Sequence, residues 1–183
     1  YLFVFSIGFL SSFSLLSYNL VYINFFSYPA LLWVLLLYSK NKIISFNIGW
    51  LFGFSYFISN LYWITHSLTF EDIFKPLIPF ALILIPLFLG LFYGISTLVF
   101  SFLNPKKNLL SILILTTSLS VVEYFRSFIF GGFPWNLIAF SFVNYVEFIQ
   151  LLSLTGTYTF NSLIILLFLL PIILFFDYEK KIK

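Results

Sequence analysis

Long apolar segments separated by short polar ones make up almost the whole chain. Taken in order, they predict six helices that span a membrane, over residues 1–17, 28–39, 43–65, 77–103, 109–129 and 147–176. Several windows exceed the ~18 apolar residues that mark a spanning helix. The predicted fold class is therefore all-α, a polytopic transmembrane helix bundle with one domain over residues 1–183.

Some residues inside these segments predict how the helices pack or bend. Gly49 and Gly53 are four residues apart and form a small-residue face that allows another helix to approach closely. Pro29 is expected in the first turn of its helix, where its missing N–H costs nothing. The helix over 147–176 exceeds the ~20 residues needed to span, so we expect its first turns in the interface or its axis tilted.

The composition narrows the class of protein further. Hydrophobic residues make up 62% of the chain and charged residues 8%, against roughly a quarter charged in soluble domains. There is no cysteine and one histidine, His66, so we expect no metal, no cofactor and no cysteine nucleophile in these residues. The basic residues are not interleaved with the aromatic ones, which argues against a nucleic-acid surface.

The basic residues also predict an orientation in the membrane. Numbering the loops alternately places seven of them on one side: Lys40, Lys42, Lys106, Lys107, Lys180, Lys181 and Lys183. The other side receives two basic residues and four acidic ones: Lys75, Arg126, Glu71, Asp72, Glu123 and Glu147. Because cytoplasmic loops carry the excess of Lys and Arg, we expect both ends of the chain on the cytoplasmic side. The region from Glu123 to Glu147 then lies near the outer face.

Glu123 and Arg126 are the charged residues that are most informative about function. They are three residues apart, so they share one face of a helix and can pair. Charged groups in membrane helices are costly and usually line a cavity or pathway. One interpretation is a structural ion pair or an interfacial anchor. The other is that they bind a lipid phosphate or shape an opening for a substrate.

Three further polar or aromatic positions follow on the same side. The turn that contains Pro134, Trp135 and Asn136 either ends a helix at the membrane surface or organises a site with a ring face and an amide. Gln150 is one turn beyond Glu147, and its amide is expected to find a partner across helices.

The sequence shows no phosphate-binding loop, no Ser-His-Asp set and no His-Glu-x-x-His, and inverted repeats are not apparent.

Several short motifs occur in a characteristic order along the chain. They are Pro29-Ala-Leu-Leu-Trp33, the segment from Gly49 to Trp63, Glu123-Tyr-Phe-Arg126, Gly132-Phe-Pro-Trp-Asn136, Gln150 and Gly156-Thr-Tyr158. This series resembles the apolipoprotein N-acyltransferase family, which shows Glu-Trp-Leu-Arg, Gly-Phe-Pro-Trp and Gly-x-Tyr-Gly-Leu-Ser at similar spacing. Departures from the usual Trp, Gly, Gly and Ser of the family are Tyr124, Ser127, Thr159 and Asn161.

The resemblance implies an enzyme of the bacterial inner membrane. It would transfer an acyl chain from a phospholipid donor to the N-terminal amine of a diacylglyceryl-cysteine on an apolipoprotein acceptor, through a thioester. The family's catalytic Glu, Lys and Cys lie in a nitrilase-like domain after a further helix, so we expect residues 1–183 to be a fragment without catalytic residues.

This part would anchor the enzyme, as a monomer, and shape the lateral opening for both lipids. The residues expected at that rim are Glu123, Arg126, Pro134, Trp135, Asn136, Gln150 and Tyr158.

Two other functions remain open at this point. A small transporter or channel subunit would need polar residues that converge at mid-bilayer from several helices. Glu123, Arg126, Glu147 and Gln150 cluster near one face instead, which favours a rim over a conduit. A membrane scaffold without lipid chemistry is the third possibility.

Overall fold

The computed structural model describes residues 1–15, 19–129 and 136–176, and within these ranges all regular structure is helical. The elements are α1 (Leu2–Ser12), η1 (Val21–Ile23), α2 (Asn24–Tyr38), α3 (Lys42–Asn60), α4 (Ile64–Ser67), η2 (Asp72–Leu77), α5 (Ile78–Leu103), α6 (Leu109–Ile129), η3 (Ile138–Phe142), α7 (Val146–Ile149), α8 (Leu151–Thr155) and α9 (Thr157–Leu169). The predicted all-α bundle is confirmed.

Fewer helices meet the requirements for spanning a membrane than the six predicted. In the described part of the chain, four segments are long and apolar enough: Val21–Tyr38, Asp72–Leu103, Leu109–Ile129 and Thr157–Phe176. The 11 residues of α1 reach ~17 Å, short of the ~30 Å hydrocarbon core. The 19 residues of α3 reach ~28 Å, but Lys42, Asn47 and Asn60 make this helix less apolar.

The structure corrects several predicted boundaries. The first helix ends at Ser12, not at 17, and α3 ends at Asn60, with the short α4 following as a separate element. Helix α2 begins earlier than predicted, at Asn24, whose side-chain Oδ1 accepts a hydrogen bond of 2.6 Å from the Ser11 hydroxyl of α1. Pro29 therefore lies inside α2 and not in its first turn. The bounds of α5 and α6 agree with the prediction to within one residue.

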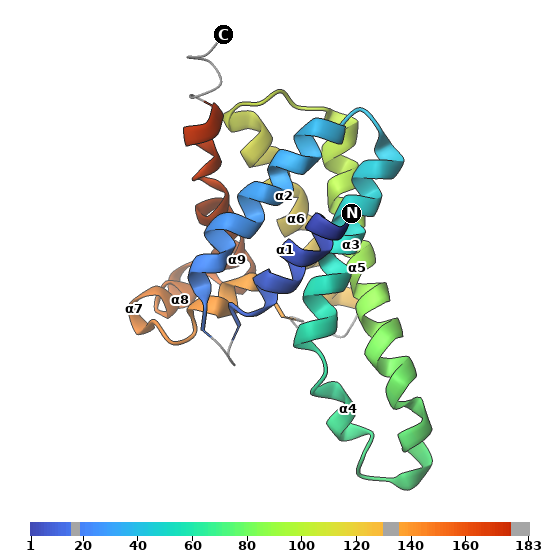
Figure 1. Cartoon of the computed structure of the whole chain (residues 1–183). Helices are drawn as coiled ribbons and strands as arrows, with labels where there is room; N and C mark the ends of the chain where they lie inside the picture. Colours follow the sequence, from blue (N-terminus) through green and yellow to red (C-terminus); the bar gives the residue numbers. More distant parts are fainter. Residues whose placement is uncertain (16–18, 130–135, 177–183) are drawn as a thin grey trace.

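The predicted last helix is divided at Gly156. This glycine has φ of 75° and ψ of 163°, a conformation that glycine adopts at no steric cost. The chain before it forms α7 and α8, which lie to one side of the bundle in Figure 1, while α9 continues into the bundle. The extra length of the predicted helix thus belongs to two short helices, not to a tilted span.

The most extensive contact between two helices joins α3 and α5, which lie side by side (Figure 1). Around this pair, α1 packs on α3, α6 packs on α5 and α9, and α2 packs on α9. A Cβ added at Gly49 would lie 2.1 Å from Thr97 Oγ1 and 2.5 Å from the Tyr93 carbonyl oxygen, and one at Gly53 would lie 2.8 Å from Tyr93 Cβ. The predicted small-residue face is therefore the contact of α3 with α5.

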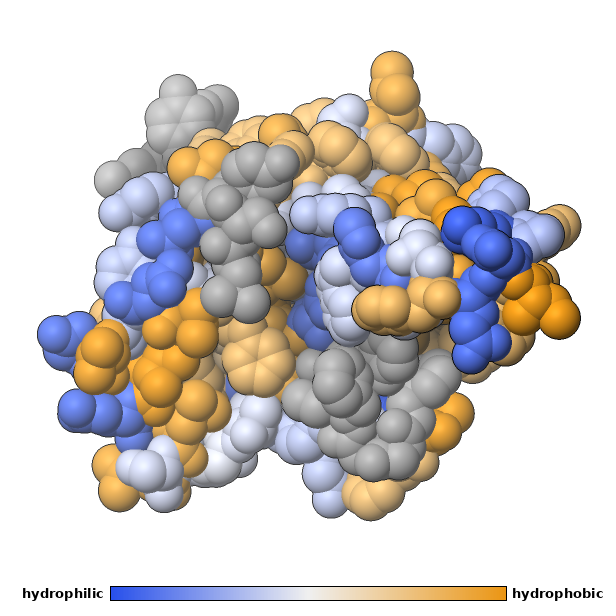
Figure 2. Space-filling view, turned by 90° about the horizontal axis from the view of Figure 1, so that it is seen from below, coloured by the Kyte–Doolittle hydropathy of each residue, from blue (hydrophilic) through white to orange (hydrophobic). Residues whose placement is uncertain are grey.

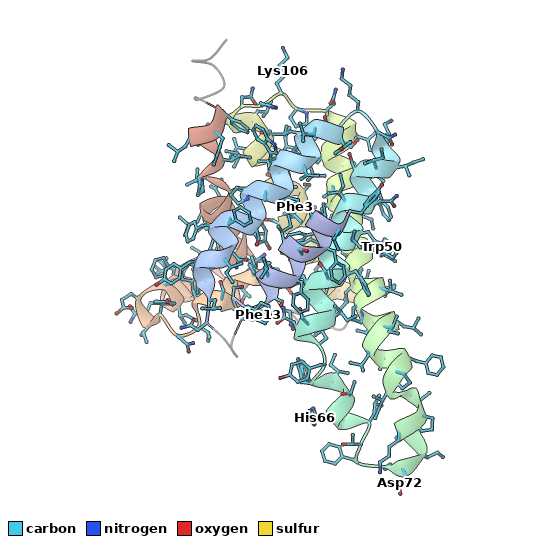
Figure 3. The ribbon with its side chains drawn as sticks, in the orientation of Figure 1. Phe3, Phe13, Trp50, His66, Asp72 and Lys106 are labelled. Atoms are coloured by element: carbon cyan, nitrogen blue, oxygen red, sulfur yellow. The ribbon has the colours of Figure 1, made fainter. Side chains whose placement is uncertain are left out.

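The two ends of the bundle differ in charge. Lys106 lies at one end, in the α5–α6 connection, and the α2–α3 connection is at the same end (Figures 1 and 3). Asp72 and His66 lie at the opposite end, where α4, η2 and the start of α5 project beyond the other helices. The α2–α3 and α5–α6 connections, in or beside which four of the seven lysines lie, are thus at the same end, as the alternate numbering of loops predicted, and Lys180, Lys181 and Lys183 fall outside the described residues.

Replacing Gly49 with alanine should destabilise the bundle. Alanine gains up to ~1 kcal/mol of helix propensity over glycine, but overpacking against Thr97 and the α5 backbone costs about 1–3 kcal/mol. We therefore expect a lower melting temperature in detergent for Gly49→Ala than for the wild type. The control is Ile43→Ala on the same helix, where the side chain is 73% exposed and no such drop is expected. An unchanged or raised melting temperature for Gly49→Ala would contradict the close contact.

Candidate functional site

A buried polar cluster lies among α5, α6 and α9, centred on Glu123. This side chain is 2% exposed. The Tyr93 hydroxyl of α5 donates a hydrogen bond of 3.2 Å to Oε1, and the Asn161 side-chain amide of α9 donates one of 2.5 Å to Oε2. Each carboxyl oxygen therefore accepts a hydrogen bond from a different helix, and Glu123 links three helices.

Asn161 extends this cluster to the segment that follows α6. Its Oδ1 accepts a hydrogen bond of 3.1 Å from the backbone N–H of Ala139 in η3. From α3, the Tyr56 hydroxyl donates a hydrogen bond of 2.9 Å to the backbone carbonyl of Asn136. Asn136 has a φ of 42°, in the left-handed region that asparagine tolerates better than most residues. Two side chains therefore fix the backbone at residues 136 and 139.

Arg126 lies on the same face of α6 as Glu123, as predicted, and is 1% exposed. Its Cζ is 5.3 Å from the centroid of the Phe57 ring, within the ~6 Å of a cation–π contact. The predicted interfacial position is not observed, because the side chain is buried. A direct ion pair with Glu123 is not observed either. Among the described residues, the ion pair present joins Lys75 to Asp72, and Arg126 acts on Glu123 as a nearby charge.

Aromatic rings enclose the cluster and exclude water from it. Tyr56 and Phe57 are fully buried, and Tyr93 is 1% exposed. The Tyr93 ring centroid is 5.8 Å from that of Phe57 and 6.2 Å from that of Tyr56, distances at which aromatic pairs stabilise a core. The members of the cluster are almost wholly buried, and their hydrogen bonds join helices.

The other predicted rim residues lie in different environments. Gln150 is exposed between α7 and α8, so the prediction that its amide joins two helices is wrong. Tyr158 is half-buried, and its ring packs edge-on against the Tyr124 ring of α6 at a centroid distance of 5.3 Å. Pro134 and Trp135 fall outside the described residues.

Sequence reasoning missed the three partners that complete the cluster, Tyr56, Tyr93 and Asn161. Asn161 appeared only as a departure from a family motif. A signal was present, because an amide in the middle of an apolar span must find a partner on another helix. The tyrosines gave no comparable signal, since the chain contains 12 of them.

A cavity of about 480 Å³ opens where α1 and α3 end. Its walls are both polar and apolar, formed by Phe9, Ser12, Phe13, Leu15, Ile58, Ser59, Asn60, Tyr62 and Trp63. Phe13 lies toward the same end of the bundle as His66 (Figure 3). Figure 2 views the molecule from this end and shows hydrophilic and hydrophobic residues next to one another. In the described part of the chain, no group of three or more His, Cys, Asp or Glu residues is placed to hold a metal ion.

Comparison with known proteins identifies the family. The family described as apolipoprotein N-acyltransferase N-terminal domain matches residues 7–170. The chain belongs to this family. The matched range includes Glu123, Asn136 and Asn161, so the buried cluster lies within the N-terminal domain of the apolipoprotein N-acyltransferases.

Individual apolipoprotein N-acyltransferases are similar over most of the chain. The one from Allorhizobium ampelinum is 33% identical over 159 residues, which are 82% of this chain and 30% of the relative. The one from Sinorhizobium fredii is 30% identical over 173 residues, 90% of this chain and 32% of the relative. The Brucella suis protein is 35% identical over 128 residues, 69% and 24% of the two chains. The matched part of the chain thus spans about a third or less of these relatives.

Replacing Asn161 with leucine tests the cluster, because leucine keeps the branched shape and the number of side-chain heavy atoms and removes the amide. The change removes the hydrogen bonds to Glu123 and Ala139. Hydrogen bonds between membrane helices contribute about 0.6 kcal/mol on average and at most about 1.7, so we expect a loss of about 1–3 kcal/mol in unfolding free energy. The matched control on α9 is Ser162→Ala, whose hydroxyl bonds only to the Tyr158 carbonyl one turn earlier. Equal stability of the two variants in detergent would contradict the role of Asn161.

Proposed function

We propose that this chain is the membrane part of an apolipoprotein N-acyltransferase. The whole enzyme would transfer an acyl chain from a phospholipid to the N-terminal amine of a diacylglyceryl-cysteine on a lipoprotein, through a thioester. The observation that carries the proposal is the family match over residues 7–170. Because the matched relatives are about three times as long, the proposal assigns the catalytic Glu, Lys and Cys to protein outside residues 1–183.

The part described here would anchor that catalytic domain. Glu123 and Asn161 tie α5, α6, α9 and η3 together, and Tyr56 holds the backbone at Asn136. A domain attached at the end of the bundle where α6 ends would therefore rest on elements fixed by buried hydrogen bonds. Small displacements of reacting groups can cost about a hundredfold in rate, which gives such an anchor a catalytic value.

The cavity at the end of α1 and α3 supports a role in lipid access. Its aromatic and apolar walls suit acyl chains, whereas Ser12, Ser59 and Asn60 suit a polar headgroup. We propose that this end faces the outer side of the bacterial inner membrane and that the lysine-bearing end is cytoplasmic. The support is the positive-inside distribution of lysines, with Lys106 at the far end of the bundle (Figure 3).

The burial of the polar cluster favours this anchor over a transporter or channel. A conduit needs polar side chains that water or a substrate can reach. Glu123 and Asn161 are at most 2% exposed and bond to each other, and Arg126 is equally buried against Phe57.

The proposal is tested by an N-acylation assay on the full-length protein, with a diacylglyceryl peptide and a phospholipid. We expect activity in the wild type and none in residues 1–183 alone. Glu123→Ala should lower the rate by about tenfold or more, because it releases Asn161 and Tyr93 from α6. The control Glu147→Ala, at an exposed carboxyl in α7, should retain the wild-type rate.

Two results would count against the proposal. A folded full-length protein that does not acylate the peptide would refute the enzymatic function. Equal rates for Glu123→Ala and Glu147→Ala would leave the enzyme and refute the anchoring role of the cluster.

A further inference from the structure

The cavity at the ends of α1 and α3 contains side-chain oxygens whose lone pairs are available to a ligand. The Ser12 hydroxyl donates its hydrogen to the Phe9 carbonyl at 2.6 Å. The Ser59 hydroxyl lies 3.2 Å from two carbonyls of the preceding turn, so its one hydrogen is used there. Asn60 donates an amide N–H to the Tyr56 carbonyl at 3.1 Å. The two hydroxyl oxygens and Asn60 Oδ1 can therefore accept hydrogen bonds from a ligand.

The two helix ends at the cavity favour a positively charged ligand. Both α1 and α3 run toward this end of the bundle (Figure 1), and the C-terminus of a helix carries about half a negative charge. In α3, the Leu61 N–H donates to the Phe57 carbonyl at 2.9 Å. In the described part of the chain, no backbone N–H donates to the carbonyls of residues 58–60. A cation is stabilised at such an end, whereas a phosphate or carboxylate is not.

Aromatic rings form much of the cavity wall, and none of its lining residues is charged. The rings belong to Phe9, Phe13, Tyr62 and Trp63. Tyr62 is 54% exposed and Trp63 48% exposed, so a ligand can reach both. Ring faces attract an ammonium group within ~6 Å of the ring centroid. Residues 16–18, which follow Leu15 in the chain, contain no charged side chain either.

We propose that this cavity binds a primary ammonium group carried by a lipid. The inference rests on the proposed acyltransferase function, in which two molecules can carry such a group. One is an ethanolamine phospholipid, and the other is the acceptor, through its N-terminal amine. The cavity of about 480 Å³ is within the ~300–1,000 Å³ of small-molecule sites.

An ammonium group matches the acceptors of the cavity better than an apolar occupant does. It has three N–H donors, which can bond to Ser59, Asn60 and the carbonyls at the end of α3. An apolar side chain from elsewhere in a longer protein would cover these oxygens without supplying a donor, which is unfavourable.

The test measures lipid binding to the full-length protein in a mild detergent by native mass spectrometry. One pair of ligands is phosphatidylethanolamine and phosphatidylethanol, which has the same phosphate and two-carbon headgroup but no amine. The other pair is a diacylglyceryl peptide with a free N-terminus and its N-acetylated form. We expect about tenfold tighter binding of the amine-bearing member, as for hydrogen bonds to a charged group. A preference in the first pair alone identifies the phospholipid as the source of the amine, and one in the second pair alone identifies the acceptor.

Variants of the cavity locate the preference. Asn60→Leu should remove most of it and leave the affinity for the amine-free ligands unchanged. The matched control is Asn47→Leu, on the same helix but 13 residues or ~20 Å away and outside the cavity. Ser59→Ala, a smaller change, should reduce the preference about threefold, the typical contribution of one hydrogen bond. Melting temperatures equal to that of the wild type would show that the variants are folded.

Three results would overturn the proposal. The first is equal affinity within both ligand pairs, as expected if a lysine from elsewhere in the protein occupies the cavity. The second is an equal effect of folded Asn60→Leu and Asn47→Leu on the preference. The third is a wild-type preference in Ser59→Ala. Because the readout is binding, each of these results is distinct from a failure of the N-acylation assay, which would refute the enzymatic function.

Discussion

A carboxyl group buried among apolar helices is costly unless hydrogen bonds replace the water it has lost. Glu123 meets this constraint with one donor from α5 and one from α9. Tyr93 and Asn161 are 30 and 38 residues away in the sequence, so the carboxyl is satisfied only when the three helices are packed as observed. A third hydrogen bond extends this network to η3, because the Ala139 backbone N–H donates to Oδ1 of Asn161.

The close contact of α3 with α5 is the second condition for this arrangement. At Gly49 and Gly53 the two helices approach so closely that a Cβ would not fit between them. As a result, Tyr56 of α3 and Tyr93 of α5 come within 6.2 Å, measured between ring centroids. One of these tyrosines binds Glu123 and the other binds the backbone of Asn136. Gly49 and Gly53 of α3 thereby position Tyr93, which binds Glu123 near the end of α6, and Tyr56, which binds the backbone that follows α6.

The sequence was most informative where a signal is local. Hydropathy located α5 and α6 to within one residue, and the spacing of Gly49 and Gly53 identified a helix contact. It failed where the outcome depends on tertiary neighbours. Gly156 reads equally well as part of an apolar helix until its φ of 75° is seen.

The same limit applies to the candidate site. The spacing of Glu123 and Arg126 placed them on one face, but not in the core, because burial depends on the aromatic residues of α3 and α5. An amide at Asn161 indicates that a partner exists, but not that the partners are Glu123 and Ala139, which lie 38 and 22 residues before it.

The central claim is that Glu123 and Asn161 stabilise the bundle as a pair. It is tested most directly by a double-mutant cycle with Glu123→Leu and Asn161→Leu, measuring the unfolding free energy of the full-length protein in mixed micelles. Each single change leaves one buried polar group without its partner, whereas the double change removes both groups. We predict that the double variant is more stable than the sum of the single losses implies, by about 0.5–3 kcal/mol. Additive losses would contradict the claim.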